Sequence, residues 1–202
     1  MKNIVKEEVT REFWVSKEEP KRIIQSVIKN NSILYLEGYL FDKDDTKKAM
    51  IDLCKIALNK GSLICLSLSD SFCVERHRND FLSLIKNYGD ILFGNDQEIK
   101  ALLNGQKKEK ISSIVEIAVV TSGSKGANIL TENRIIFIPP IAGLNVIDTT
   151  GAGDLFASGF LFGFSKKLPL VDCGKLATQG ASHIIQQYGA RPSENLSKIV
   201  IT

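Results

Sequence analysis

Short apolar runs alternate with amphipathic helical segments over most of the chain, and this alternation constrains the fold more than any other feature. Buried strands are expected over 32–36, 63–68, 90–93 and 114–121. Helices are expected between and after them, over 44–59, 74–87, 96–103, 152–165 and 170–187. Because strand–helix–strand units join parallel neighbours, the pattern predicts an α/β fold with a mainly parallel, twisted sheet covered by helices on both faces.

The remaining segments add smaller elements. A hairpin is expected over 127–130 and 134–139, and a short strand over 145–148. Pro20 is well placed to begin a helix over 20–28, after a polar stretch at 1–19 that reads as a loose tail or a frayed helix. No internal repeat or convincing linker divides the rest. We therefore expect a tail and helix of uncertain role over 1–32 and one domain over 33–202.

Composition excludes several classes of protein. A chain of 202 residues, 44% of them hydrophobic, can bury a core without disulfides or metal and is not expected to be disordered. Its 26 basic and 23 acidic residues are scattered, so no nucleic-acid partner is expected. The four cysteines form no CxxC pair and are expected to be the free, buried thiols of a cytoplasmic protein. No run of about 18 apolar residues predicts a membrane span, and the charged N-terminus lacks a signal-peptide core.

The densest chemical signal is the segment 146–154, VIDTTGAGD, which leads directly into the apolar helical run LFASGFLFGF. A glycine-rich turn that opens a helix leaves backbone N–H groups unpaired at the positive end of the helix dipole, and such a site binds phosphate-like anions. Gly151 and Gly153 would let an anion approach the backbone. Asp154 is either a functional acid of this site or only a first-turn carboxylate favoured by the dipole. Neither GxxxxGK[ST] nor a complete GxGxxG is present.

The segment DTTGAGD resembles the second signature of the ribokinase-like carbohydrate kinases, the PfkB family, which reads D-T-x-G-A-G-D. Three other segments agree with that family in the expected order. FGNDQE at 93–98 resembles its N-x-x-E motif, VVTSGSKGA at 119–127 its T-x-G-x-x-G strand and loop, and YGARP at 188–192 its closing G-A-x-P turn. LYLEGYLFD at 34–42 is similar to its mid-chain strand and leans toward the sugar and adenosine branch.

The resemblance implies a ribokinase-like, three-layer α/β/α fold and an ATP-dependent transfer of the γ-phosphate to an alcohol group of a sugar or nucleoside. By the same resemblance, Asp154 would be the catalytic base that takes the proton from the attacking hydroxyl. Gly151, Ala152 and Gly153 would supply N–H donors to the moving phosphoryl group.

Nucleotide and magnesium binding would fall to residues of two other motifs. Asn95 and Glu98 would help to position Mg²⁺ and the phosphates through water, since residues three apart share a helix face. Thr121, Gly123 and Gly126 would hold ATP. The alternatives are that Glu98 is a solvated helix charge and that the two glycines form a plain β-turn.

Asp148 and Thr150 match positions that help to hold a monovalent cation such as K⁺ in some family members, with Gly189 and Ser193 as candidate partners. The alternative is that Asp148 simply caps the turn. The two histidines lie outside all the motifs, and both are interpreted as surface or satisfied side chains.

Length bears on function, because PfkB family members are usually longer than this chain. The Gly-Gly segment, the acceptor-binding Asp and Asn and the small β-sheet lid of the family have no counterpart in 1–32, so we expect a chain truncated at its N-terminus. An exposed sheet edge would favour self-association or pairing with a separately encoded N-terminal half. The chain would then be a kinase half hindered by truncation, a non-catalytic nucleotide-binding remnant, or a kinase for a small heteroaromatic alcohol.

Overall fold

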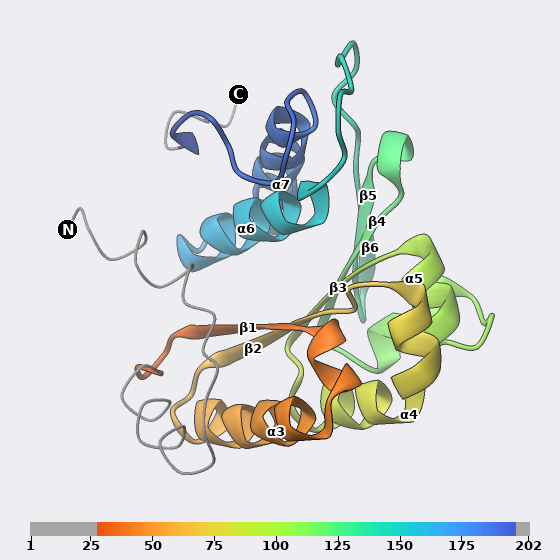
Figure 1. The fold of residues 1–202 in the computed structure, drawn as a ribbon, viewed down its shortest axis with the longest axis vertical. Helices are drawn as coiled ribbons and strands as arrows, with labels where there is room; N and C mark the ends of the chain where they lie inside the picture. The colour runs from red at the N-terminus through yellow and green to blue at the C-terminus, as the bar shows by residue number, and fades with distance from the viewer. Residues whose placement is uncertain (1–27, 197–202) are drawn as a thin grey trace.

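The computed structural model describes residues 28–196, which form three layers around one six-stranded sheet (Figure 1). The strands lie in chain order, with β1 to β4 parallel and with β5 and β6 antiparallel to their neighbours. This arrangement confirms the mainly parallel sheet. The bounds of β1 to β6 are Ile33–Glu37, Leu63–Ser67, Ile91–Asn95, Ile117–Thr121, Ala127–Thr131 and Arg134–Ile138.

Helices cover both faces of the sheet, as the strand–helix alternation predicts. One face carries α3 (Asp44–Asn59), α4 (Ser71–Tyr88) and α5 (Asp96–Leu102). The other face carries α6 (Ala152–Ser165) and α7 (Leu170–Ile184), as Figure 1 shows. Three short 3-10 helices complete the described chain: η1 (Gly38–Asp42), η2 (Lys108–Ser113) and η3 (Gly123–Lys125).

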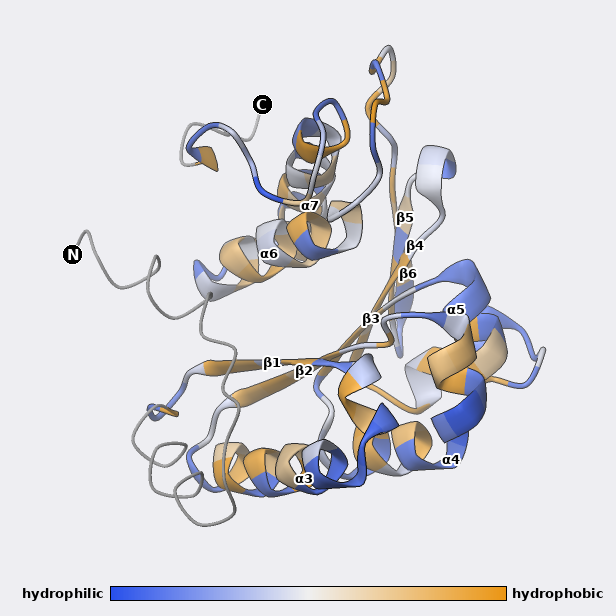
Figure 2. Ribbon diagram, viewed as in Figure 1, coloured by the Kyte–Doolittle hydropathy of each residue, from blue (hydrophilic) through white to orange (hydrophobic). Residues whose placement is uncertain are grey.

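Alternate residues of the central strands enter two separate cores. In β3, Leu92 belongs to the core beneath α3, α4 and α5, whereas Ile91 and Phe93 belong to the core beneath α6 and α7. In β4, Val120 and Val119 divide in the same way. Figure 2 shows these apolar strands between the two helical layers. Burial on both faces explains why the strands appear in the sequence as continuous apolar runs.

The strand predicted over 145–148 is wrong. Val146 and Ile147 lie outside the sheet, with 57% and 42% of their surface exposed. The N–H groups of Ile147 and Asp148 instead donate to the carbonyl oxygen of Ile185, at 2.8 and 3.3 Å, just after the end of α7. A strand needs a neighbouring strand for its backbone hydrogen bonds, and within residues 28–196 no strand pairs with this segment. The helix predicted over 20–28 and the tail over 1–19 fall outside the described residues, apart from Ile28.

Glycines bring α6 and α7 into close contact. A Cβ added at Gly159 would lie 2.6 Å from the carbonyl oxygen of Leu176, and one at Gly163 would lie 3.1 Å from the Cα of Cys173. On the facing helix, a Cβ at Gly180 would lie 2.8 Å from the carbonyl oxygen of Leu155. The two helix backbones can therefore touch only because these side chains are absent, and this contact fixes where α6 begins.

The interior is apolar and contains all four cysteines. Each cysteine is free and buried, as the sequence predicts. At the edge of the described sheet, β1 pairs only with β2, and Ile33, Leu34 and Tyr35 are only partly buried there. None of the helices within residues 28–196 is long and apolar enough to cross a membrane.

Gly159→Ala is expected to lower the free energy of unfolding by about 1–3 kcal/mol, because the new methyl group must push α7 away. Helix propensity alone would favour alanine by about 1 kcal/mol, so the sign of the change is diagnostic. The matched control is Gly153→Ala, where an added Cβ meets no atom within 4 Å. Urea unfolding of the three proteins checks the prediction, and a Gly159→Ala protein more stable than the wild type would contradict it.

Candidate active site

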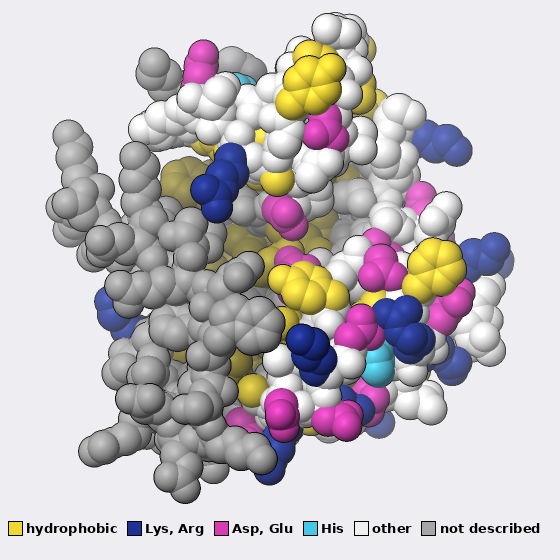
Figure 3. Space-filling model, in the orientation of Figure 1, with side chains coloured by type: hydrophobic (Ala, Val, Ile, Leu, Met, Phe, Trp, Pro, Cys, Tyr) yellow, Lys and Arg dark blue, Asp and Glu magenta, His cyan; other side chains and the backbone are white. Residues whose placement is uncertain are grey.

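The residues predicted to act on phosphates converge at the carboxyl ends of the parallel strands. Asn95 and Thr121 are the last residues of β3 and β4 and are partners in the strand register. Asp154 lies in the first turn of α6, on the other side, and its charge acts on the hydroxyl group of Tyr35 in β1. Figure 3 shows a hollow between α6 and the strands, with apolar side chains at its floor and acidic side chains along its rim.

Asn95 and Glu98 bind each other in a reciprocal cap at the start of α5. The Oδ1 atom of Asn95 accepts hydrogen bonds from the backbone N–H groups of Gln97 and Glu98, each at 2.9 Å. The Glu98 carboxylate accepts in return from the backbone N–H of Asn95 at 2.9 Å and from its Nδ2 at 2.6 Å. This is a capping box. The N-x-x-E spacing therefore has a structural role of its own, and Glu98 is not a solvated helix charge, because only 7% of it is exposed.

Glu98 belongs to a group of three acids, of which the sequence motifs predicted only Glu98 itself. Burial raises the pKa of Glu98, and the charges of Asp70 and Glu37 raise it further, against a hydrogen bond from Asn95 that lowers it. Glu37 ends β1 and Asp70 follows β2, so three neighbouring strands each lead to a carboxylate at the same edge. The available signal was an acid close behind each apolar run: Glu37 directly follows Leu36, and Asp70 lies two residues after Leu68.

Glu37 connects this group of acids to Asp154. Its Oε2 atom accepts a hydrogen bond from the Oγ of Ser69 at 2.9 Å. Burial raises the pKa of the Tyr35 hydroxyl, and the carboxylates of Glu37 and Asp154 raise it further. Tyr35 is thus a neutral group between the acids of the strand ends and the acid of α6.

The turn before α6 has an open N-terminal end. Gly151 adopts a left-handed conformation with φ 78°, and a Cβ there would lie 2.8 Å from the Cα of Ala190. The turn therefore requires glycine for its backbone angle and for its contact with the G-A-x-P segment. Within residues 28–196, the N–H groups of Gly153 and Asp154 donate to no backbone oxygen, and no side chain caps the helix. These groups and the exposed Asp154 can face a bound anion.

Asp148 ties this turn to the C-terminal segment. Its Oδ1 accepts from the N–H and the Oγ1 of Thr150, at 2.9 and 2.7 Å, and its Oδ2 accepts from the N–H of Gly189 at 2.9 Å. The hydroxyl of Thr150 and the N–H groups of Gly189 and Thr150 hold the pKa of Asp148 below its usual range. Ser193, a predicted partner, hydrogen bonds instead to Gln187.

The turn between β4 and β5 contains the remaining predicted residues. Gly123 and Gly126 both have positive φ, 56° and 89°. A Cβ at Gly126 would collide with the carbonyl oxygen of Ile138, whereas one at Gly123 would meet no atom within 4 Å. Gly126 is thus required by packing, and Gly123 leaves an open backbone surface beside Thr121.

A cavity in the described part of the chain lies elsewhere. It has a volume of about 830 Å³ and is lined by η2, the start of β4, the β5–β6 turn and Leu170 of α7. This is the opposite end of β4 from Thr121, and it contains none of the predicted site residues. The candidate site is therefore identified by its converging acids and open N–H groups, and not by cavity size.

Comparison with known proteins identifies the family. The model of the pfkB family carbohydrate kinases matches residues 8–196. The chain belongs to the pfkB family. The fold is the ribokinase-like one that the family resemblance implies: a probable sugar kinase from Rhizobium etli is 41% identical with a TM-score of 0.84, covering 89% of this chain and 56% of that chain. An adenosine kinase from Sinorhizobium meliloti is 35% identical with a TM-score of 0.84, covering 88% and 56%.

This chain spans about half the length of the relatives that it matches. An uncharacterised sugar kinase from Archaeoglobus fulgidus is 36% identical over 121 residues, which are 58% of this chain and 48% of that protein. The described part contains one six-stranded sheet. The N-x-x-E motif begins at the end of β3, the T-x-G-x-x-G motif at the end of β4, and DTTGAGD leads into α6.

Asn95→Ala is expected to lower the free energy of unfolding by about 1–2 kcal/mol, because loss of an N-cap side chain leaves helix N–H groups unpaired. Gln97→Ala is the matched control, since Gln97 is exposed in the same turn and contributes only its backbone N–H. Its effect is expected to stay within about 0.5 kcal/mol. Equal losses in the two variants, measured by urea unfolding, would contradict the capping role.

Glu98 also makes stability depend on pH. Because the pKa of Glu98 in the folded chain is above its ordinary value of 4.5, the folded state binds the proton more tightly than the unfolded state. As pH rises from about 4.5 through the raised pKa, the wild type is therefore expected to lose stability relative to Glu98→Gln. Urea unfolding of both proteins across this range measures the difference, and a relative gain by the wild type with rising pH would refute it.

Proposed function

We propose that this chain is the nucleotide-binding and phosphoryl-transfer part of an ATP-dependent kinase that phosphorylates an alcohol group of a sugar or nucleoside. One observation carries the proposal. Asp154 is an exposed acid in the first turn of α6, next to N–H groups that donate to no backbone oxygen, and its charge acts on Tyr35 of β1. A candidate base and candidate N–H donors thus lie at the same helix end.

The reaction needs positioning and charge stabilisation more than covalent chemistry. Asp154 would accept the proton of the attacking hydroxyl, and the N–H groups of Gly151 and Gly153 would stabilise charge on the moving phosphoryl group. The N–H of Ala152, also predicted as a donor, instead donates to the carbonyl oxygen of Thr149 at 3.1 Å. The open backbone at Gly123, next to Thr121, is suited to contact with the nucleotide. The rigid Asp148 and Gly151 contacts hold the donors in place before substrate arrives.

The donor set fits magnesium held through water. Glu37, Asp70 and Glu98 provide hard carboxylate oxygens whose charges act on one another, and a divalent cation would relieve that repulsion. Both oxygens of Glu98 already accept from Asn95, which favours an outer-shell role. When bound, Mg²⁺ supplies neutralisation of charge on the phosphates.

The hydrogen bonds of Asp148 favour a turn-closing role over potassium binding. Both carboxylate oxygens of Asp148 face N–H or O–H donors of Thr150 and Gly189, and Ser193 bonds elsewhere. This arrangement favours the interpretation that Asp148 closes the turn, so we assign K⁺ no role.

The acceptor is proposed at the level of chemical class. The two similar structures are a probable sugar kinase and an adenosine kinase, and both names imply an alcohol acceptor.

Since this chain spans 56% of each, we further propose that β1, an edge strand of the described sheet, joins a second copy or a separate N-terminal half. The four free cysteines support a cytoplasmic location.

The test measures ATP binding with Mg²⁺ and phosphoryl transfer to adenosine, ribose and fructose by the full chain. Asp154→Asn is expected to keep ATP binding and to lower transfer by about 10²–10⁴-fold, because a general base is lost. The matched control is Asp172→Asn in the first turn of α7, which is expected to change neither.

The outcomes separate the remaining alternatives. A chain that fails to bind ATP would refute the proposal. A chain that binds ATP but transfers to no acceptor, alone or with an N-terminal half, would be a nucleotide-binding remnant. Transfer unchanged in Asp154→Asn would contradict its assignment as the base.

A further inference from the structure

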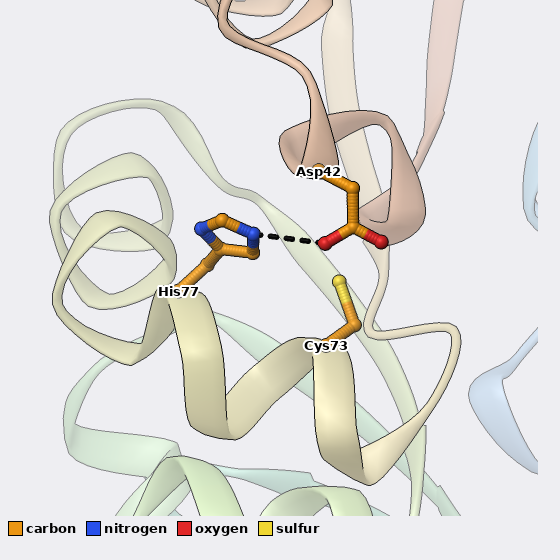
Figure 4. A group of neighbouring side chains, drawn as sticks. All are labelled: Asp42, Cys73 and His77. Atoms are coloured by element: carbon orange, nitrogen blue, oxygen red, sulfur yellow. Dashed lines mark hydrogen bonds and ion pairs between the residues drawn. The ribbon is translucent and has the colours of Figure 1, made fainter.

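Three side chains of the kinds that bind transition metals meet between η1 and α4, as Figure 4 shows. Asp42 ends η1, whereas Cys73 and His77 lie four residues apart on α4 and share one face. The ligand atoms of the three residues all lie within 4.8 Å of one another. The Nε2 of His77 lies 2.9 Å from the Oδ1 of Asp42, and the sulfur of Cys73 points toward the same carboxylate.

The surroundings of the cluster are partly apolar and open on one side. Cys73 is fully buried, and its thiol donates to the carbonyl oxygen of Gly38 at 3.4 Å. The His77 ring packs beside Phe41 and Phe81, with ring centroids 6.2 and 6.4 Å away. The side chain of Asp42 is 41% exposed, so an ion could enter from solvent on that side.

The charged groups around the cluster nearly balance. Arg76 binds both oxygens of Asp42 through Nη2, at 2.9 Å each. The Asp80 carboxylate lies 3.9 Å from the Nδ1 of His77 and is paired with Lys47. Arg76 therefore competes with any cation for Asp42, whereas Asp80 can orient the His77 ring.

We propose that Asp42, Cys73 and His77 bind a divalent transition-metal ion of the zinc type, with water in the fourth position. One carboxylate oxygen, one imidazole nitrogen and one thiolate form a donor set that suits Zn²⁺ and excludes Mg²⁺ and Ca²⁺, which prefer oxygen alone. A metal–sulfur bond forms as the S–H bond of Cys73 breaks, the proton passes to water, and no group is oxidised. The site shares no residue with the candidate active site and does not depend on the proposed kinase function, although it adjoins that site, since the backbone N–H of Cys73 donates to the Oδ1 of Asp70 at 2.8 Å.

Binding at this site has a structural consequence. The ion would add a further link between η1 and α4, which already meet through the Asp42 ion pairs, the Cys73 contact with Gly38 and the packing of Phe41 against His77 and Phe81. Coordination through the thiolate releases the Cys73 proton, so binding should strengthen as pH rises. Saturating metal is expected to raise the midpoint of thermal unfolding by about 5–10 °C.

Cobalt titration of the full chain is the test, because a Co²⁺–thiolate bond gives a near-ultraviolet charge-transfer band and Zn²⁺ should displace it. Cys73→Ser is expected to abolish the band. The matched control is Cys54→Ser. Cys54 is also free and fully buried, and burial raises the pKa of its thiol to about 12, but it lies on α3, away from the cluster. If Cys73→Ser fails to fold, Asp42→Asn changes only an exposed side chain and is expected to weaken Co²⁺ binding at least about tenfold.

Arg76→Gln separates a metal site from a plain ion-pair cluster. Removing the competing guanidinium is expected to tighten Co²⁺ binding about two- to fivefold, because an exposed ion pair such as Arg76–Asp42 contributes only a small free energy. Weaker binding in this variant would contradict Asp42 as a ligand. Absence of the charge-transfer band at millimolar Co²⁺, or a band that persists in Cys73→Ser, would overturn the proposal.

Discussion

The parallel pairing of β1 to β4 is the constraint on which the candidate site depends. Parallel strands place their carboxyl ends at one edge, and the register of β3 with β4 sets Asn95 beside Thr121. The acids that follow β1, β2 and β3 act on one another at the same edge. Burial of both sheet faces keeps this register fixed, because a slip of one residue would move every apolar side chain to the opposite core.

The second half of the site depends on close backbone contacts on the other face. Gly159, Gly163 and Gly180 let α6 and α7 touch, and Gly151 lets the turn before α6 touch Ala190. These contacts place the open end of α6 over the strand ends. Glycine thus has two roles here: it permits close packing of backbones, and it leaves N–H groups open to a phosphate.

Much of this arrangement could be predicted from the sequence. The strands, the main helices and the hairpin are local patterns, and the helices that follow DTTGAGD and N-x-x-E begin where the sequence predicts them. The strand predicted over 145–148 is wrong because apolar residues do not supply a neighbouring strand. Glu37 and Asp70 were missed because neither belongs to a recognised motif, and only the folded sheet brings the ends of their strands near Glu98.

By itself, the sequence determined the α/β class, the family motifs and the position of Asp154 at a helix start, because each follows from residues close together in the chain. Only the tertiary structure decided which distant groups meet. It places Asp42 against His77, 35 residues away, whereas the contact of Asp148 with Gly189, 41 residues away, was expected from the family resemblance alone. It also shows that Asn95 and Glu98 cap a helix as well as border the site. Such contacts depend on how helices pack against the sheet, and no local pattern of residues records that packing.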